Sequence, residues 1–289
     1  MAPHQNARAA ALDGILQRQR AWAKDIDREE PHYADYVLAQ DGNLFQPLKA
    51  PTLADFQKGS GGEFKRRRHK KTGAIFPPKF NALKSSSVLV CNVFDNWRGG
   101  GEALVGEALN CQPHAMVEME FEAQFENGVS PRPCNLDLAL HAKDGWVCAV
   151  EGKFTEPLGR KSPLKSQYLP QLPQPTPWKS AGLKNCDTLA REHSEYTLLD
   201  VPQLLKHILG LHRTLKGRDA FRLTYLYYDF EGELGQKHAD EVKQFKDTID
   251  GEIDFASMTY QTLVPRMKEL SNGKPEKYFS YLKDRYHLG

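Results

Sequence analysis

The stretch that decides the fold spans residues 135–154 and reads NLDLALHAKDGWVCAVEGKF. Residues 136–140 alternate leucine with smaller side chains, including Asp137, and this period of two predicts a β-strand with one apolar face. Residues 146–154 predict a second strand. Between them, Lys143-Asp144-Gly145 is a hairpin turn signal. We therefore expect the two strands to pair as an antiparallel hairpin.

Further strands and helices are expected around this hairpin. Residues 117–122 alternate apolar residues with glutamates, and residues 221–230 are rich in Tyr and Leu, so both predict strands. Residues 31–84 and the proline-rich residues 157–178 are expected to be irregular. Apolar spacing predicts helices over residues 6–25, 102–109, 200–215, 239–249, 260–270 and 275–286. The order of elements predicts a mixed sheet with helices, which is an α/β layer architecture.

The composition excludes several classes of protein. The chain has 289 residues, of which 40% are hydrophobic and 10% aromatic, so a disordered or collagen-like chain is excluded. We expect no membrane-spanning helix, because no run of roughly 18 apolar residues occurs. The N-terminus lacks the apolar stretch of a signal peptide, so a cytoplasmic location is expected. Five cysteines without a C-x-x-C pair argue against a zinc site or a disulfide framework.

The charge is distributed unevenly along the chain. The net charge is only +2, but residues 58–84 hold nine Lys and Arg against one Glu, so this segment carries +8 and the remainder −6. Dense Lys and Arg favour binding to a phosphate backbone through counterion release, whereas the alternative is a solvated loop. The scarcity of nearby aromatic residues favours double-stranded DNA over single strands. The residues expected to contact phosphates are Lys65, Arg66, Arg67, Arg68, Lys70 and Lys71.

Three polar residues lie on the hairpin strands where an apolar core would exclude them. Glu151 and Lys153 are two residues apart and share a face, and pairing of the strands brings Asp137 close to Glu151. Buried carboxylates are costly unless they are paired or bind a metal, although a salt bridge on an exposed hairpin is the alternative. Two carboxylates and a main-chain carbonyl, that of Gly152, suit Mg²⁺ or Mn²⁺. The pattern indicates metal-dependent phosphodiester hydrolysis, with Lys153 positioning water and stabilising charge on the phosphate.

These residues resemble the D…(D/E)-x-K signature of the PD-(D/E)xK nuclease superfamily. Asp137 is followed after thirteen residues by Glu151-Gly152-Lys153, and Leu136 stands where the superfamily usually has proline. The resemblance implies a restriction-endonuclease-like core, with a central mixed sheet of four to five strands flanked by helices. It also implies an upstream acidic metal ligand, which matches Glu120 or, as the alternative, Glu118.

A narrower resemblance is to a group of bacterial restriction-endonuclease-like proteins. It rests on the Glu120 strand, on the residues around Glu151-Gly152-Lys153, and on further short segments: Ser85-Ser86-Ser87, Phe255, Thr259-Tyr260-Gln261, Tyr281-Leu282 and Arg285-Tyr286. The resemblance covers residues 85–286. We therefore divide the chain into an N-terminal helix and basic, loop-rich segment (residues 1–84) and a nuclease-like domain (residues 85–289).

The sequence thus predicts a Mg²⁺-dependent DNA endonuclease, with Mn²⁺ able to substitute. Asp137 and Glu151 would hold the metal with Gly152 and Glu120, and Lys153 would complete the catalytic set. A role in restriction or defence follows from the family resemblance. A homodimer is expected if both strands of a duplex are cut. Two alternatives stay open: a catalytically silent nucleic-acid-binding module of the same fold, and a structure-selective repair or recombination nuclease.

Overall fold

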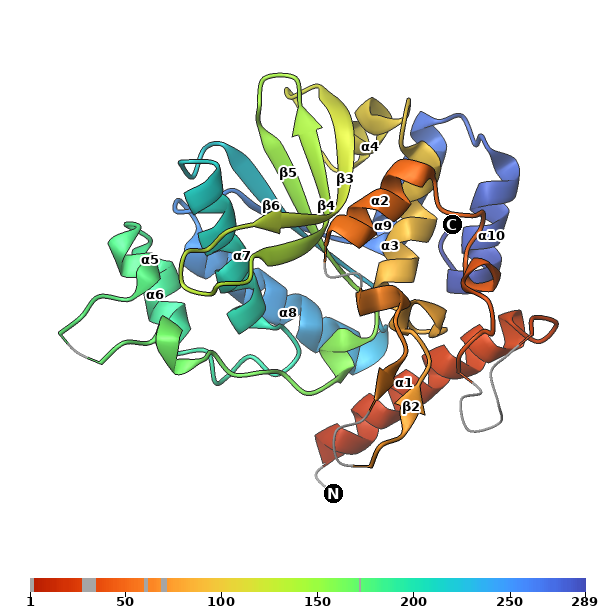
Figure 1. Ribbon diagram of the computed structural model, residues 1–289, viewed down its shortest axis with the longest axis horizontal. Coiled ribbons are helices and arrows are strands. Elements are labelled where there is room, and N and C mark those ends of the chain that lie inside the picture. The colour runs from red at the N-terminus through yellow and green to blue at the C-terminus, as the bar shows by residue number, and fades with distance from the viewer. Residues whose placement is uncertain (1–2, 28–34, 60–61, 69–71, 172) are drawn as a thin grey trace.

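A five-stranded sheet forms the centre of the computed structural model, which describes residues 3–27, 35–59, 62–68, 72–171 and 173–289 (Figure 1). The strand order is β3-β4-β5-β6-β7, with β3, β4 and β5 antiparallel and with β6 and β7 parallel to β5. The mixed α/β sheet is therefore confirmed. The strands are β3 (Met116–Phe125), β4 (Cys134–Ala142), β5 (Val147–Lys153), β6 (Phe221–Tyr227) and β7 (Phe255–Thr259).

The hairpin of β4 and β5 is formed as its sequence predicts. Leu138 lies opposite Val150 and Leu140 opposite Cys148, with a turn at residues 143–145. Every residue of β5 is buried, because this strand lies at the centre of the sheet with helices on both faces. The charged pair at its carboxyl end is therefore carried into the interior.

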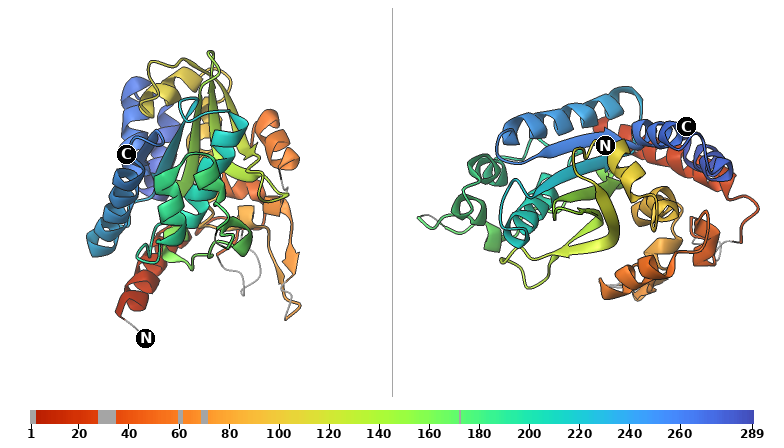
Figure 2. Two further views of the ribbon diagram at one scale, coloured as in Figure 1. Left: turned by 90° about the vertical axis from the view of Figure 1, so that its left-hand side faces the viewer. Right: turned by 90° about the horizontal axis from the view of Figure 1, so that it is seen from above.

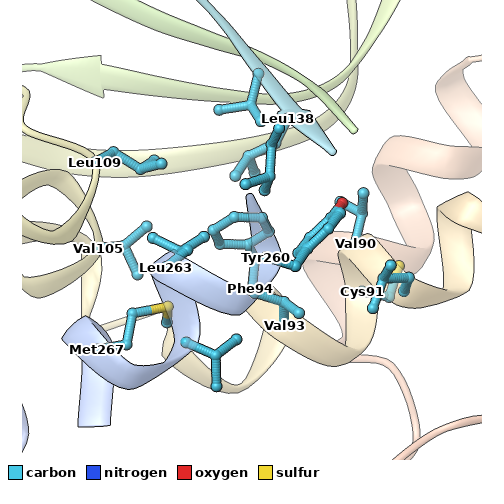
Figure 3. Close-up of a cluster of buried hydrophobic side chains, with 14 of the residues drawn as sticks. Val90, Cys91, Val93, Phe94, Val105, Leu109, Leu138, Tyr260, Leu263 and Met267 are labelled. Atoms are coloured by element: carbon cyan, nitrogen blue, oxygen red, sulfur yellow. The ribbon is translucent and has the colours of Figure 1, made fainter. Parts of the chain in front are cut away.

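One face of the sheet is covered by helices from both halves of the chain. Their apolar side chains form a cluster with Leu138 and Val150 of the sheet, part of which is shown in Figure 3. Ser85 caps the first of these helices by accepting a hydrogen bond from the Val88 amide. The helices are α3 (Ser86–Phe94), α4 (Glu102–Ala108), α9 (Tyr260–Leu270) and α10 (Glu276–Tyr286).

The opposite face is covered by a second group of helices, so that the sheet is sandwiched between two layers (Figure 2). Asp200 caps one helix of this layer, α7, by accepting a hydrogen bond from the Gln203 amide at 3.0 Å. This cap fixes the first turn of α7 beside the carboxyl end of β5. The helices are α5 (Pro177–Ser180), α6 (Lys184–Arg191), α7 (Val201–Thr214) and α8 (Gly232–Ile249).

The N-terminal residues pack against the nuclease-like core. Helix α1 (Pro3–Trp22) lies along α10, where the buried Arg285 guanidinium donates hydrogen bonds to Asn43 and lies 4.0 Å from the centre of the Trp22 ring. Helix α2 (Ala50–Lys58) covers the edge strand β3, whose Phe121 amide donates a hydrogen bond to Asp55. The remaining elements here are η2 (Gln40–Asn43), η3 (Gly62–Phe64), η4 (Lys79–Asn81), β1 (Arg67–Arg68) and β2 (Ile75–Phe76).

Some elements differ from the sequence-based expectation. Residues 31–84 were expected to be irregular, but α2 forms there, because its proline lies in the first turn, where a missing N–H costs little. Strand β7 was also not predicted, because it is short and runs directly into α9. Helix α6 was not predicted either. The elements that connect the rest are η5 (Asp95–Trp97), η6 (Glu156–Leu158) and η7 (Ser166–Tyr168). Among the described residues, none of the helices has the length and apolarity to span a membrane.

Candidate active site

The end of the hairpin remote from its turn brings together the three residues that the sequence singled out. Asp137 Oδ2 accepts a hydrogen bond of 2.7 Å from the Gly152 amide, so the Asp137 carboxylate is held against the strand that carries Glu151 and Lys153. All three side chains line one cavity of about 560 Å³. We call it the acidic cavity, because six carboxylates line it against four cations. The carboxylates belong to Glu63, Glu122, Asp137, Glu151, Glu156 and Asp200.

Glu151 lies between two cationic side chains. It is 2% exposed, its Oε1 contacts the Lys153 ammonium, and its Oε2 lies 3.1 Å from His207 Nε2. Burial alone would raise the pKa of Glu151, but the charges of Lys153 and His207 lower this pKa to about 2. Glu151 is therefore an anion at neutral pH.

Lys153 is fixed by two partners at the wall of the acidic cavity. Its Nζ donates one hydrogen bond to Glu151 and another, of 2.9 Å, to Gln203 Oε1. Burial opposes the charged form, but the Glu151 carboxylate raises the pKa of Lys153 above its ordinary value. The ammonium group is therefore charged and already oriented, and it can stabilise negative charge but cannot act as a base at neutral pH.

Helix α7 supplies two site residues that the sequence analysis did not identify. Gln203 and His207 are one turn apart on the face of α7 that meets β5, and both contact the charged pair there. Burial would lower the pKa of His207, but Glu151 raises this pKa to about 9. In the sequence, Gln203 and His207 could be recognised only by their i, i+4 spacing on a helix with a strong N-cap. That spacing does not show which strand the helix covers.

Asp137 and Glu122 are the carboxylates in the acidic cavity whose charge is least compensated. Burial raises the pKa of Asp137 well above its ordinary value, and the nearby Glu151 carboxylate raises it further. Burial also raises the pKa of Glu122, and the charges of Glu63 and Glu151 raise it further. A hydrogen bond of 3.1 Å from the Asn135 amide to Glu122 Oε2 acts in the opposite direction. A cation in this cavity would relieve the repulsion among these groups.

Glu122, and not Glu120, is the upstream acid that lines the acidic cavity. Glu120 instead lies 3.1 Å from Lys58 Nζ and 3.4 Å from His141 Nε2. Its hydrogen bond with His141, together with Lys58, lowers the pKa of Glu120 to about 2. The sequence analysis grouped Glu120 with Asp137 and Glu151 as metal ligands. In the structure, neither Glu120 nor the exposed Glu118 lines the cavity that contains those two carboxylates.

A change of face in β3 and β4 accompanies the placement of Glu122, and not Glu120, in the acidic cavity. Phe121 and Leu138 are paired and pack into the cluster on one face, whereas the next pair, Ala123 and Leu136, packs into the cluster on the other. Residues two apart on a regular strand share a face, so both strands twist between these pairs. Glu122 lies at the twist with a φ of 49°, a left-handed conformation that is rare for residues other than glycine.

Gly152 is required by packing on the opposite side of β5. A Cβ at this position would lie 2.5 Å from a Val90 methyl and 2.6 Å from the Tyr260 hydroxyl. Val90 and Tyr260 belong to the apolar cluster that Figure 3 shows beside Leu138. The absence of a side chain therefore lets α3 and α9 approach the strand, and the side chains of Glu151 and Lys153 point to the other face.

The basic run lies beside the acidic cavity. Residues 65–68 are exposed, and Arg67 lines a groove of about 360 Å³ together with Lys79 and Lys84. This groove adjoins the acidic cavity, because both are lined by Lys79 and Ser86. Of the remaining residues predicted to bind phosphate, Lys70 and Lys71 lie outside the described residues.

The donor set fits a hard divalent cation. Mg²⁺ is usually held by one or two carboxylates and keeps several waters, which Asp137 and Glu151 at the end of the hairpin can satisfy. Asp137 is buried beside the Glu151 anion, and both raise the pKa of Asp137, an effect that a bound cation would oppose. Over the described ranges, no three His, Cys, Asp or Glu side chains converge closely enough to hold one ion. A metal here would therefore rely on two carboxylates with main-chain and water oxygens.

Comparison with known families identifies a match over most of the chain. A family model described as "Restriction Endonuclease associating with ARP" (REase-ARP) matches residues 18–287, which includes the last turn of α1 and every strand of the central sheet. No curated protein and no solved structure gives a significant match to the chain.

Proposed function

Because the chain belongs to the REase-ARP family of restriction endonucleases, we propose that it is a metal-dependent DNA endonuclease whose active site is the acidic cavity. The observation that carries the proposal is the convergence of Asp137, Glu151 and Lys153 at the end of the β4–β5 hairpin. Two carboxylates and one charged lysine around a cavity suit hydrolysis of a phosphodiester.

Asp137 and Glu151 would hold Mg²⁺ or Mn²⁺, with the Gly152 carbonyl as a further oxygen ligand. The bound metal supplies a Lewis acid for the phosphoryl oxygen and lowers the pKa of a water molecule. We place Glu122 in this set instead of Glu120, since its carboxylate lines the same cavity and adds to the negative potential that attracts the cation.

Lys153 would stabilise the negative charge that develops on the phosphate during attack by water. Glu151 and Gln203 already hold its ammonium group, so little reorganisation is needed when the charge develops. His207 keeps Glu151 ionised from the side opposite Lys153. Glu151 therefore keeps a full negative charge for the metal while it positions the lysine.

Incubation of the full chain with supercoiled plasmid tests the proposal. We expect cleavage with Mg²⁺ or Mn²⁺ and none with EDTA. Discrete fragments would indicate a restriction-type activity, whereas a smear would indicate non-specific or structure-selective cutting. The enzyme proposal fails if DNA is bound but neither metal supports cleavage of plasmid, linear duplex or single strands. That result would favour a silent DNA-binding module of the same fold.

A further inference from the structure

A second cavity, of about 510 Å³, adjoins the acidic cavity. The two share Asn135, Asp200 and Gln203 as a common wall. Its other walls come from residues 127–134 before and at the start of β4, from residues 162–168, and from α7. This volume lies within the range of sites for small organic molecules. We call it the cationic cavity.

The charges that line this cavity are mostly positive. Arg132, Lys165 and Lys206 line it, and Asp200 is the single carboxylate among the described lining residues. Asp200 is already engaged as the cap of α7 through its Oδ1. Within the described ranges, none of the three cationic side chains forms a hydrogen bond or an ion pair. Their charges are therefore available to an anion.

The inner wall of the cavity is held rigid by its own hydrogen bonds. Asn127 accepts hydrogen bonds from the amides of Val129 and Ser130, and it donates one to Cys134 Sγ and one to the Tyr168 hydroxyl. This network ties the loop before β4 to residues 162–168. These hydrogen bonds fix the walls relative to one another, so binding need not order them.

His207 adds a buried polar group that the active site does not fully use. It is 4% exposed and lines the cationic cavity, while its Nε2 lies beside Glu151. The Cys134 thiol, which also lines the cationic cavity, interacts with the same imidazole. His207 therefore lies between the two cavities, and its positive charge adds to that of Arg132, Lys165 and Lys206 in the cationic cavity.

We propose that the cationic cavity binds the nucleotide next to the scissile phosphodiester, in an unpaired segment of the DNA strand. The inference rests on the proposed function, which places the scissile phosphate in the acidic cavity. The neighbouring nucleotide then crosses the shared wall of Asn135, Asp200 and Gln203. Beyond that wall, its phosphate meets Arg132, Lys165 and Lys206.

The shape of the cavity selects an unpaired nucleotide. Three separate chain segments surround it, and Pro133, Pro163 and Leu164 supply apolar surface for a base or sugar. A base enters such a pocket only after it leaves the stack, which is least costly in a single strand or at a distorted site. The basic run still suits duplex DNA, so the substrate combines a duplex with an unpaired nucleotide at the site of cleavage.

Binding measurements in EDTA test this inference separately from catalysis. Fluorescence anisotropy would compare a labelled single strand of DNA with a blunt duplex of the same sequence. The proteins are the full chain, Lys206→Gln, Arg132→Gln, and Lys268→Gln as a control on an exposed part of α9 outside both cavities. We expect each cavity variant to lower affinity for the single strand by about tenfold and to change duplex affinity far less, with the control unchanged.

Competition distinguishes a nucleotide site from a simple phosphate site. Thymidine monophosphate is expected to displace the single strand at concentrations at which inorganic phosphate does not. The inference is overturned if both competitors act equally, or if both cavity variants bind the single strand like the unmodified chain. These binding experiments contain no metal and do not depend on cleavage. An absence of cleavage in the plasmid assay would therefore count against the proposed function and leave the binding result standing.

Discussion

The acidic and cationic cavities are neighbours of similar volume and opposite charge. The acidic cavity, about 560 Å³, is lined by six carboxylates, whereas the cationic cavity, about 510 Å³, is lined by one. Glu151 and Lys153 lie at the buried end of a central strand, while Arg132 and Lys165 are exposed on loops. Charges fixed by the sheet can polarise a reacting bond, whereas cations on surface loops can only attract and position a strand.

This contrast predicts different consequences of substitution on the two sides. In the acidic cavity, loss of Asp137, Glu151 or Lys153 should lower the rate of cleavage with little effect on DNA binding. In the cationic cavity and the basic groove, loss of a charge should weaken binding and change its dependence on salt. If variants in both cavities changed cleavage and DNA binding to the same extent, the two cavities would not have distinct roles.

The largest effect is expected for Lys153→Met, which keeps the apolar stem and removes the charge. We expect the cleavage rate to fall by at least about 100-fold, because the variant lacks a fixed donor to the developing negative charge. Affinity for DNA in EDTA should stay within about a factor of two of the unmodified chain. Circular dichroism and thermal melting would establish that the variant folds. An undiminished rate in a folded variant would remove Lys153 from the mechanism.

The next effect separates two glutamates that sequence alternation treats alike. Glu122→Gln should lower Mg²⁺-dependent cleavage on the order of tenfold, because it removes one negative charge from the acidic cavity. Glu120→Gln is the matched control on the same strand and should leave cleavage unchanged, since Glu120 contacts Lys58 and His141 outside the cavity. Titration of the rate with Mg²⁺ would measure both. The reverse order of effects would restore Glu120 as the upstream acid.

A smaller effect is expected when Arg66, Arg67 and Arg68 are changed together to Gln. Affinity for duplex DNA should fall, and the slope of log K against log salt should flatten by roughly one for each phosphate that the variant no longer neutralises. The rate of cleavage at saturating DNA should not change, because these residues are exposed beside the groove and not in the acidic cavity. An unaltered salt slope would mean that the run is a solvated loop.

The smallest effect concerns Lys161 at the rim of the acidic cavity. Burial lowers the pKa of Lys161 to about 8, so its ammonium group is charged below that pH and neutral above it. Affinity for DNA should therefore decrease by a small factor as the pH rises from about 7 to about 9. Lys161→Arg keeps its charge over this range and should flatten the profile. Identical profiles for both proteins would exclude a role for this titration.

The sequence predicted the hairpin and its three polar residues because both follow from local patterns. Alternation placed β4 and β5, and spacing by two placed Glu151 and Lys153 on one face. Glu122 could not be chosen over Glu120, since that depends on a left-handed residue and a twist shared by two strands. Gln203 and His207 were missed because their role depends on how α7 docks on β5.

The cationic cavity had no signature in the sequence. Arg132, Lys165 and Lys206 belong to three segments that only tertiary packing brings together. The basic run of residues 65–71, by contrast, is visible in the sequence because its charges are consecutive. Local periodicity thus identifies a site carried by one pair of strands, whereas a cavity assembled from separate segments of the chain can be identified only from the fold.

A crystal of the full chain soaked in Mn²⁺ tests the central claim most directly. Anomalous diffraction would locate the ion independently of any assumption about its ligands. We predict a single strong peak in the acidic cavity, bound by oxygens of Asp137 and Glu151, and absent from an Asp137→Asn crystal. A fully soaked crystal with no peak in that cavity, or with its peak at Glu120, would contradict the account.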